Sequence, residues 1–222
     1  MVVTIDGPSG AGKSTVSRKL ALLLGFAFLD TGALYRGVAL AAQWAGLESD
    51  DEAAVAAWLE GLDLAARPQG GRFMVLLEGR DVEPFIRNEE VANLASRLSA
   101  QAAVRGHLLG LQRQAGVLGD LVAEGRDMGT VVFPKAEAKF FLNASPAERA
   151  RRRFLELKSS QPGLTLEEVL ADLNQRDQRD AARSLSPLKP AADALVVDTT
   201  SLSQEQVIAL LLDKVRALAG KS

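Results

Sequence analysis

Cysteine is absent from the 222-residue sequence, and histidine occurs once. Without cysteine the chain can form neither disulfides nor thiolate metal sites, which fits a reducing compartment. The single histidine, His107, has no neighbours with metal-ligand spacing and no nucleophile partner, so we expect a structural or surface role for it. We therefore expect a cytoplasmic protein whose chemistry depends on other residue types.

Long apolar runs and an excess of charge are also missing. The longest apolar run, Leu20–Leu29, is interrupted by Gly25 and is shorter than the ~18 residues that indicate a membrane span. The start of the sequence, Met1–Asp6, lacks the basic and apolar regions of a signal peptide. A formal net charge of -2 provides no overall positive field for a nucleic-acid backbone. We expect neither a membrane nor a nucleic acid polymer as a partner.

Short apolar runs alternate with helical patterns along the chain, and this rhythm predicts an α/β fold with a doubly wound, five-stranded parallel sheet and helices on both faces. The expected strands are Val2–Ile5, Phe26–Leu29, Asp120–Ala123, Lys139–Leu142 and Ala194–Val197. The expected helices are Lys13–Leu24, Leu34–Ala45, Asn88–Gln114, Pro146–Lys158, Leu166–Ser184 and Gln204–Leu218.

One stretch departs from this rhythm. Leu62–Ala65 and Arg72–Leu77 have the pattern of a hairpin, with the turn in the Pro- and Gly-containing segment Arg67–Gly71. We therefore expect a small substrate-binding module, inserted at about residues 46–86, within a single domain that spans residues 1–222.

The strongest motif follows the first expected strand. The segment Gly7–Ser14 matches the phosphate-loop pattern G-x-x-x-x-G-K-[ST], with a strand before it and an amphipathic helix after it. Its glycines let backbone N–H groups surround a phosphate, and the helix N-terminus adds positive potential. Lys13 is expected to reach the β and γ phosphates of ATP, and the Ser14 hydroxyl is expected to coordinate Mg²⁺. The expected ATP-binding residues are Gly7, Pro8, Ser9, Gly10, Ala11, Gly12, Lys13, Ser14 and Thr15.

Other signatures narrow the class of phosphate-loop protein. No Asn-Lys pair occurs, so the guanine-specifying N-K-x-D of GTPases is missing, as is an L-S-G-G-Q-like signature of transporter ATPases. The sequence is also too short and too acidic for a helicase. A small-molecule kinase remains.

Three further clusters offer groups for an acceptor. Asp30–Arg36 and Glu124–Thr130 each follow an expected strand, and ligands of open α/β sheets bind beyond the carboxyl ends of the strands. In the third cluster, Arg176, Asp180 and Arg183 are spaced to share one helical face, although a solvated face is the alternative for that helix taken alone. Arginines in these clusters can bind phosphate, and an aspartate can accept a hydrogen bond from a base amine.

These stretches resemble the bacterial cytidylate kinases (CMP kinases), within the P-loop nucleoside monophosphate kinases, over nearly the whole length. The matching stretches are Thr4–Ser14, Asp30–Arg36, Glu124–Pro134 and Arg176–Asp180. The resemblance implies ATP- and Mg²⁺-dependent phosphorylation of CMP and dCMP by a monomer. It also implies a core, a nucleotide-binding insert and a short lid, which we expect at about residues 145–163.

The resemblance also implies roles for individual residues. Around the cytosine it places Thr31, Ser96, Arg105 and Asp127; near the ribose, Arg176 and Asp180; and on the acceptor phosphate, Arg36, Arg126 and Arg183. Together with Lys13, the three phosphate-binding arginines are the expected catalytic residues. Three alternatives stay open: a kinase for UMP, a kinase for a shikimate-like metabolite, and a non-catalytic nucleotide-binding module.

Overall fold

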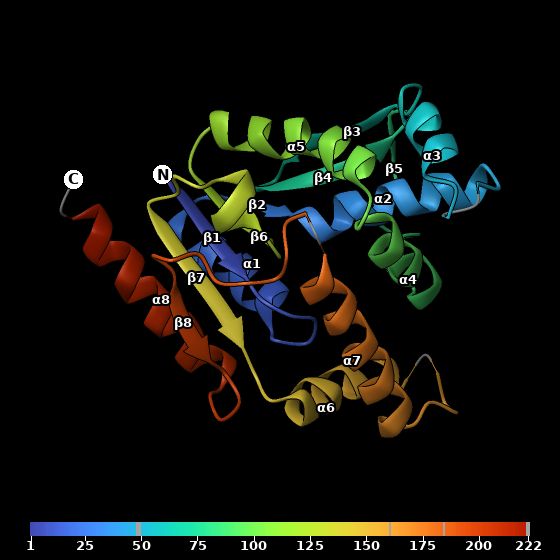
Figure 1. Cartoon of the computed structure of the whole chain (residues 1–222). Helices are drawn as coiled ribbons and strands as arrows, with labels where there is room; N and C mark the ends of the chain where they lie inside the picture. The colour runs from blue at the N-terminus through green and yellow to red at the C-terminus, as the bar shows by residue number, and fades with distance from the viewer. Residues whose placement is uncertain (48–49, 160, 184, 221–222) are drawn as a thin grey trace.

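A single mixed sheet runs through the molecule, with helices packed on it (Figure 1). The computed structural model describes residues 1–47, 50–159, 161–183 and 185–220. Its strands are β1 Val2–Asp6, β2 Ala27–Asp30, β3 Leu64–Gln69, β4 Arg72–Leu77, β5 Arg80–Asp81, β6 Leu121–Gly125, β7 Ala138–Asn143 and β8 Leu195–Asp198. Its helices are α1 Lys13–Leu24, α2 Thr31–Trp44, α3 Glu52–Leu59, α4 Glu89–Leu98, α5 Ala102–Val117, the π-helix η1 Met128–Val132, α6 Pro146–Leu157, α7 Leu166–Ala182 and α8 Gln204–Ala219.

The strand order is β3-β4-β2-β6-β1-β7-β8, with β5 paired to β4. The five strands expected from the sequence are present as the parallel run β2-β6-β1-β7-β8. The expected width of five strands is wrong, because the sheet has eight strands in the described part of the chain. The hairpin β3–β4 extends the sheet, since β4 pairs in parallel with β2 at Phe28 and Arg72.

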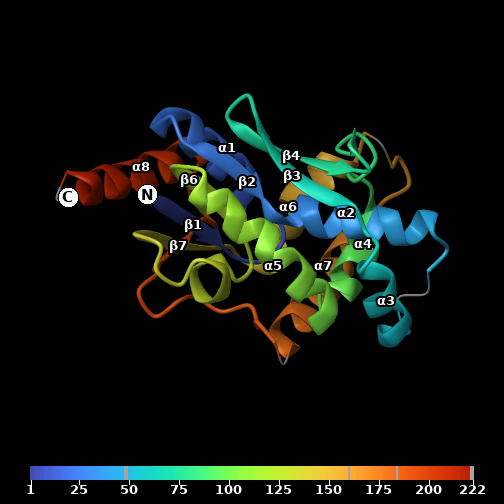
Figure 2. The same cartoon turned by 90° about the horizontal axis from the view of Figure 1, so that it is seen from above.

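Helices cover both faces of the sheet, as predicted (Figure 2). The alternation of side chains along β6 shows why two apolar layers form. Leu121 and Ala123 belong to the core shared with α2, α3, α4 and α5, whereas Val122 belongs to the core shared with α1 and α8. The strands β2 and β6 contribute to both layers, and the carboxyl ends of β1, β2 and β6 carry the phosphate loop and the clusters Asp30–Arg36 and Glu124–Thr130.

The single helix expected over Asn88–Gln114 is wrong. The structure has two helices, α4 and α5, separated by a turn at residues 99–101. Ser99 caps the C-terminus of α4, with its backbone N–H on the carbonyl of Ala95. The turn lets α5 pack beside β3 and η1, while α4 packs on α2 and α7.

The hairpin also differs from the expectation. β3 continues through Pro68 to Gln69, so the turn consists of Gly70 and Gly71, both with positive φ (59° and 78°). Proline is tolerated there because β3 is an edge strand. Helix α3, which begins after the capping side chain of Asp51, was not predicted.

Some expected positions lie outside the described residues. These are Ser184 at the end of the expected helix, residues 48–49 of the expected module and Ser160 of the expected lid. Among the helices of the described ranges, none has both the length and the apolar character needed to cross a bilayer.

Candidate active site

The phosphate loop lies between β1 and α1, as the motif predicts. Gly7, Gly10 and Gly12 all have positive φ, at 146°, 76° and 86°. A Cβ at Gly7 would lie 2.0 Å from the carbonyl oxygen of Leu142, and one at Gly10 would lie 2.9 Å from the backbone of Arg149. Glycine is therefore required at these two positions by close backbone approach as well as by dihedral angle.

Lys13 begins α1 and is 7% exposed. Its Nζ donates to the carbonyl of Pro8 at 2.7 Å, which folds the side chain back over the loop. Burial, and after it the charge of Arg126, lower the pKa of Lys13 from 10.5 to about 7, although the carboxylates of Glu124, Asp6 and Asp180 act in the opposite direction. Groups from β1, β6 and α7 thus surround the Lys13 ammonium.

Glu124, at the end of β6, lies next to the start of α1. Its side chain is hydrogen-bonded to Ser14, and burial followed by repulsion from Asp30 raises its pKa to about 7. Its Oε2 is buried without a hydrogen-bond partner among the described residues. The described ranges hold no cluster of three or more His, Asp or Glu side chains arranged to bind a metal. A hydroxyl beside an unsatisfied carboxylate oxygen nevertheless fits a hard cation that keeps most of its water ligands.

Asp6 connects the phosphate loop to the cluster Glu124–Thr130. Its carboxylate accepts from the backbone N–H of Met128 at 2.9 Å and of Gly129 at 2.8 Å, at the start of the π-helix η1. Burial raises the pKa of Asp6 to about 6, although the two backbone hydrogen bonds counteract this rise. The turn that carries Arg126 and Asp127 is therefore fixed relative to β1.

Five charged side chains from this turn, from α5 and from the C-terminal end of α7 form two groups of ion pairs. Arg126 Nε lies 2.9 Å from Asp180, which also pairs with Arg183. Arg105, on α5, pairs with Asp127. Burial alone would raise the pKa of Asp180, but Arg126 and Arg183 lower it overall, so it stays ionised near neutral pH. The structure thus brings together the predicted site residues Arg105, Arg126, Asp127, Asp180 and Arg183.

Thr31 and Arg36 lie at the start of α2, whose N-cap is Asp30. The Thr31 hydroxyl donates to the carbonyl of Glu124 at 2.6 Å, and Arg36 pairs with Asp30 at 2.9 Å. Arg87, which sequence reasoning missed, lies 3.7 Å from the same carboxylate. Burial would raise the pKa of Asp30, but the two arginines lower it. No sequence spacing links Arg87 to Asp30, so the contact follows from the tertiary fold alone.

Two predicted residues lie further along α4 and α7. Arg176 donates to the carbonyl of Ala92 at 3.3 Å and lies 3.7 Å from Asp172 and 3.9 Å from Glu89. The hydroxyl oxygen of Ser96 is buried and has no partner in the described residues. The side chains of Arg176, Asp180 and Arg183 are only 14%, 6% and 5% exposed, so they do not form a solvated helix face.

Helix α6 carries a basic run, Arg149 and Arg151–Arg153, which contacts the phosphate loop through Arg149. This side chain is buried, donates to the carbonyl of Ser9 at 3.2 Å, and pairs with Asp177 of α7 at 2.6 Å. Its neighbour Arg152 donates to the Thr199 carbonyl at 2.6 Å. The run itself was visible in the sequence, but the arginine that supports the loop could not be singled out.

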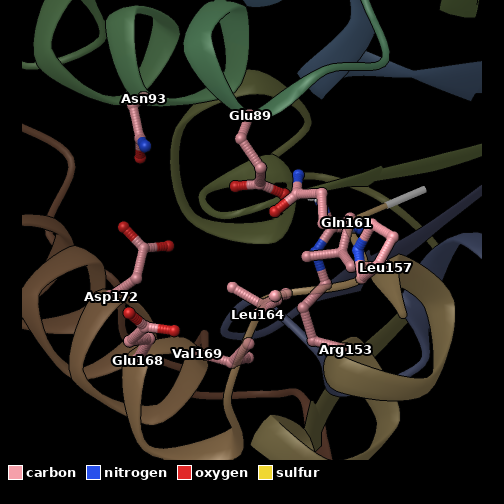
Figure 3. A pocket seen from close by; sticks show the side chains of 11 residues that line it. Glu89, Asn93, Arg153, Leu157, Gln161, Leu164, Glu168, Val169 and Asp172 are labelled. Carbon is pink, nitrogen blue, oxygen red and sulfur yellow. Dashed lines mark hydrogen bonds and ion pairs between the residues drawn. The ribbon is translucent and has the colours of Figure 1, made fainter. Parts of the chain in front are cut away.

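A cavity of about 590 Å³ lies between α4, α6 and α7 (Figure 3). Glu89 and Asn93 enter it from α4, and Glu168 and Asp172 enter it from α7. Glu89 also pairs with Arg153 of α6, so one ion pair connects the expected lid to α4. The lining residues in the described ranges include no predicted site residue. This cavity is therefore separate from the phosphate loop.

Fold and site together define the class: an α/β P-loop protein in which a strand, a phosphate loop and a helix stand beside a second, arginine-rich site. Within that class, the profile of the cytidylate kinase family matches residues 3–217. The chain belongs to the cytidylate kinase family, as the sequence motifs predicted, and is thus a phosphotransferase.

Curated relatives match over nearly the full length. The cytidylate kinase of Citrifermentans bemidjiense is 50% identical over 216 residues, which cover 97% of this chain and 93% of the relative. That of Pasteurella multocida is 47% identical over 216 residues, covering 97% and 95%. Among solved structures, a protein of Eubacterium ventriosum shares the fold, with a TM-score of 0.53 and 10% identity over 98% of this chain and 99% of that one. The family match favours cytidylate kinase over the three alternatives.

Proposed function

We propose that the chain transfers the terminal phosphoryl group of ATP to CMP and dCMP, releasing ADP with CDP or dCDP. The observation that carries this proposal is the position of Asp180. This carboxylate pairs with Arg126 at 2.9 Å, and its negative charge also raises the pKa of Lys13. A group that binds the donor phosphates and a group that binds an acceptor phosphate therefore share one site.

The donor nucleotide binds at the phosphate loop. Backbone N–H groups of the loop and the N-terminus of α1 surround the phosphates, while Lys13 leaves Pro8 and moves onto the β and γ oxygens. The residues proposed to hold ATP are Gly7, Pro8, Ser9, Gly10, Ala11, Gly12, Lys13, Ser14 and Thr15. Ser14 and, through water, Glu124 would hold Mg²⁺, which would supply charge neutralisation on the phosphate oxygens.

The site recognises the acceptor base by matching its hydrogen-bond donors and acceptors. Cytosine offers an amine donor at position 4 and acceptors at N3 and O2, and uracil reverses the pattern at position 4. The buried carboxylate of Asp127 suits the amine, and the guanidinium of Arg105 together with the free Ser96 hydroxyl suits the acceptors. Thr31 completes the base site, and Arg176 and Asp180 take the ribose.

The acceptor phosphate is proposed to bind Arg36, Arg126 and Arg183, joined by Arg87 on the evidence of its contact with Asp30. A phosphate oxygen is already anionic near neutral pH, so no strong general base is needed. These arginines and Lys13 align the two phosphates and stabilise charge that spreads over the moving group. Catalysis is thus positioning and electrostatic stabilisation by this chain's own cations.

Two segments are proposed to close over the site. The module at residues 46–86 carries α3, β3, β4 and β5, and the lid at residues 145–163 carries α6. The cavity of Figure 3 lies between α4 and the lid. If the lid closes, this cavity narrows and α6 moves toward α4. Closure would exclude water, which competes with the acceptor for the phosphoryl group.

The direct test is product identification with purified protein. With ATP, Mg²⁺ and CMP, we expect ADP and CDP in equal amounts, and little ADP without an acceptor. Lys13→Met should lower the rate by several orders of magnitude while keeping the native melting temperature, because Lys13 faces the ligand. ADP release that does not depend on CMP would contradict the proposal.

We also propose a cytoplasmic monomer: the composition fits a reducing compartment, and the resemblance to the cytidylate kinases implies the monomer. Light scattering of the purified chain at micromolar concentration should give a mass near 23.6 kDa. A mass near twice that value would contradict the monomer.

A further inference from the structure

Ser99 occupies the turn between α4 and α5 and is 6% exposed. Two arginines of the acceptor site bind it through different atoms. Arg183 Nη2 donates to the Ser99 hydroxyl oxygen at 2.7 Å, and Arg105 Nη1 donates to the Ser99 carbonyl at 3.2 Å. Ser99 therefore connects two side chains that come from α7 and α5.

The hydroxyl group of Ser99 has a fixed orientation. It donates its proton to the carbonyl of Ser96 at 2.9 Å, so its lone pairs remain available to Arg183. All polar side-chain and carbonyl groups of Ser99 are thus engaged within the protein. A serine in this arrangement acts on a ligand through its arginine partners and not by touching the ligand itself.

The two arginines continue the connection to the ends of the site. Arg183 pairs with Asp180, and Arg105 pairs with Asp127. A continuous path of hydrogen bonds and ion pairs therefore runs from Asp180 through Arg183, Ser99 and Arg105 to Asp127. Four of these five residues were expected at the acceptor site from the sequence, and Ser99 is the member that joins them.

We propose that Ser99 is a positioning residue, which holds the Arg183 and Arg105 guanidinium groups in the orientation that receives the acceptor nucleotide. This inference rests on the proposed function, from which the roles of the two arginines come. The physical reason is that a long arginine side chain loses conformational freedom on binding a ligand. A buried hydrogen-bond acceptor restricts that freedom before the ligand arrives.

A purely structural role for Ser99 is the competing explanation. A serine at a helix end commonly donates to a carbonyl three residues earlier, as Ser99 does to Ser96. Loss of that bond alone would lower the melting temperature and leave the Michaelis constants of the folded protein unchanged. A selective change in the Michaelis constant for CMP separates the two explanations.

The first experiment compares Ser99→Ala with the wild type in steady-state assays of CMP phosphorylation. Loss of one hydrogen bond to a charged donor should raise KM for CMP about tenfold, with KM for ATP changed less than twofold. Ser99→Cys, with a similar volume and a weaker acceptor, should give an intermediate KM and carries the same test if the alanine variant does not fold. The matched control is Ser201→Ala, at an exposed serine, which should behave as wild type.

A double-mutant cycle with Arg183→Ala supplies the second test. If Ser99 acts through Arg183, then Ser99→Ala should change kcat/KM for CMP less than twofold when Arg183 is already alanine. An equal loss in both backgrounds, or an unchanged KM for CMP in the single variant, would overturn the inference. A wild-type chain that does not phosphorylate CMP would instead refute the proposed function, so the two failures are distinguishable.

Discussion

Binding of ATP should take up a proton at Lys13. In the free chain this side chain is buried at the loop and donates to the Pro8 carbonyl. Burial and, after it, the charge of Arg126 lower its pKa from 10.5 to about 7. Above pH 7 the amine of the free chain is therefore largely neutral, whereas the phosphates of bound ATP favour the ammonium form.

The sign and size of the effect follow from linkage. ATP raises the pKa of Lys13 on binding, so the complex holds one more proton than the free chain, and affinity falls as pH rises. Each pH unit above the pKa of the free chain costs up to tenfold in Kd, or about 1.4 kcal/mol. Between pH 7.5 and 8.5 we expect Kd for ATP to rise close to tenfold, in a range where the phosphates themselves no longer titrate.

Isothermal titration calorimetry measures both quantities. At pH 8, titrations in two buffers with different heats of ionisation should show uptake of nearly one proton per ATP. Mg²⁺ is omitted because the pKa of Glu124 is also raised to about 7, and a cation beside it would release a proton. Lys13→Met is the control and should bind ATP weakly with a Kd independent of pH. A flat Kd in the wild type, or the same slope in Lys13→Met, would refute the reasoning.

Three further predictions concern the base site, the moving segments and the loop. Asp127→Ala should lower kcat/KM about 10- to 100-fold with CMP and less with UMP, because cytosine alone of the two carries an amine at position 4; equal losses would mean that Asp127 does not read the base. Hydrogen exchange with a bisubstrate analogue should show new protection in residues 46–86 and 145–163 and little change in the five parallel strands β2, β6, β1, β7 and β8, and protection confined to the phosphate loop would exclude closure. Gly10→Ala should destabilise the fold by about 1–3 kcal/mol, since φ is 76° there and a Cβ would meet the Arg149 backbone; an unchanged chemical denaturation curve would contradict this.

The core of the fold could be predicted because its signals are local. Each of the five parallel strands is a short apolar run, and α1 begins and ends at the expected residues, Lys13 and Leu24. The division between α4 and α5 could not be predicted in this way. Neither glycine nor proline marks the turn, which is held by tertiary contacts such as the bond from Arg105 to the Ser99 carbonyl.

The hairpin shows how context changes the effect of a residue. Pro68 indicated a turn, yet it lies within β3. Because β3 is at the edge of the sheet, the N–H that proline lacks is not needed for pairing with a further strand. Helix α3 did have a sequence signal. Asp51 precedes it, and Val55 and Leu59 are spaced four residues apart, a pattern that indicates a capped, one-sided helix.

The residues of the candidate site also fall into two groups, those with a local sequence signal and those placed only by tertiary contacts. Motif residues such as Lys13 and Asp127 could be found from their order in the chain. Arg87, Ser99 and Arg149 could not, because each reaches its partners from a segment with no motif spacing to them. Predicting such residues requires the packing of α4, α6 and α7 on the sheet.

Competition between acceptors tests the central claim most directly. Limiting ATP with Mg²⁺ is offered to the purified chain together with equal concentrations of CMP, dCMP, UMP, AMP and GMP, and the diphosphate products are separated and quantified. A site in which Asp127 accepts from the amine of cytosine and Arg105 donates to its ring acceptors predicts that CDP and dCDP account for most of the product. If UDP or the purine diphosphates formed in comparable amounts, the assignment of this site to cytidylate phosphorylation would be contradicted.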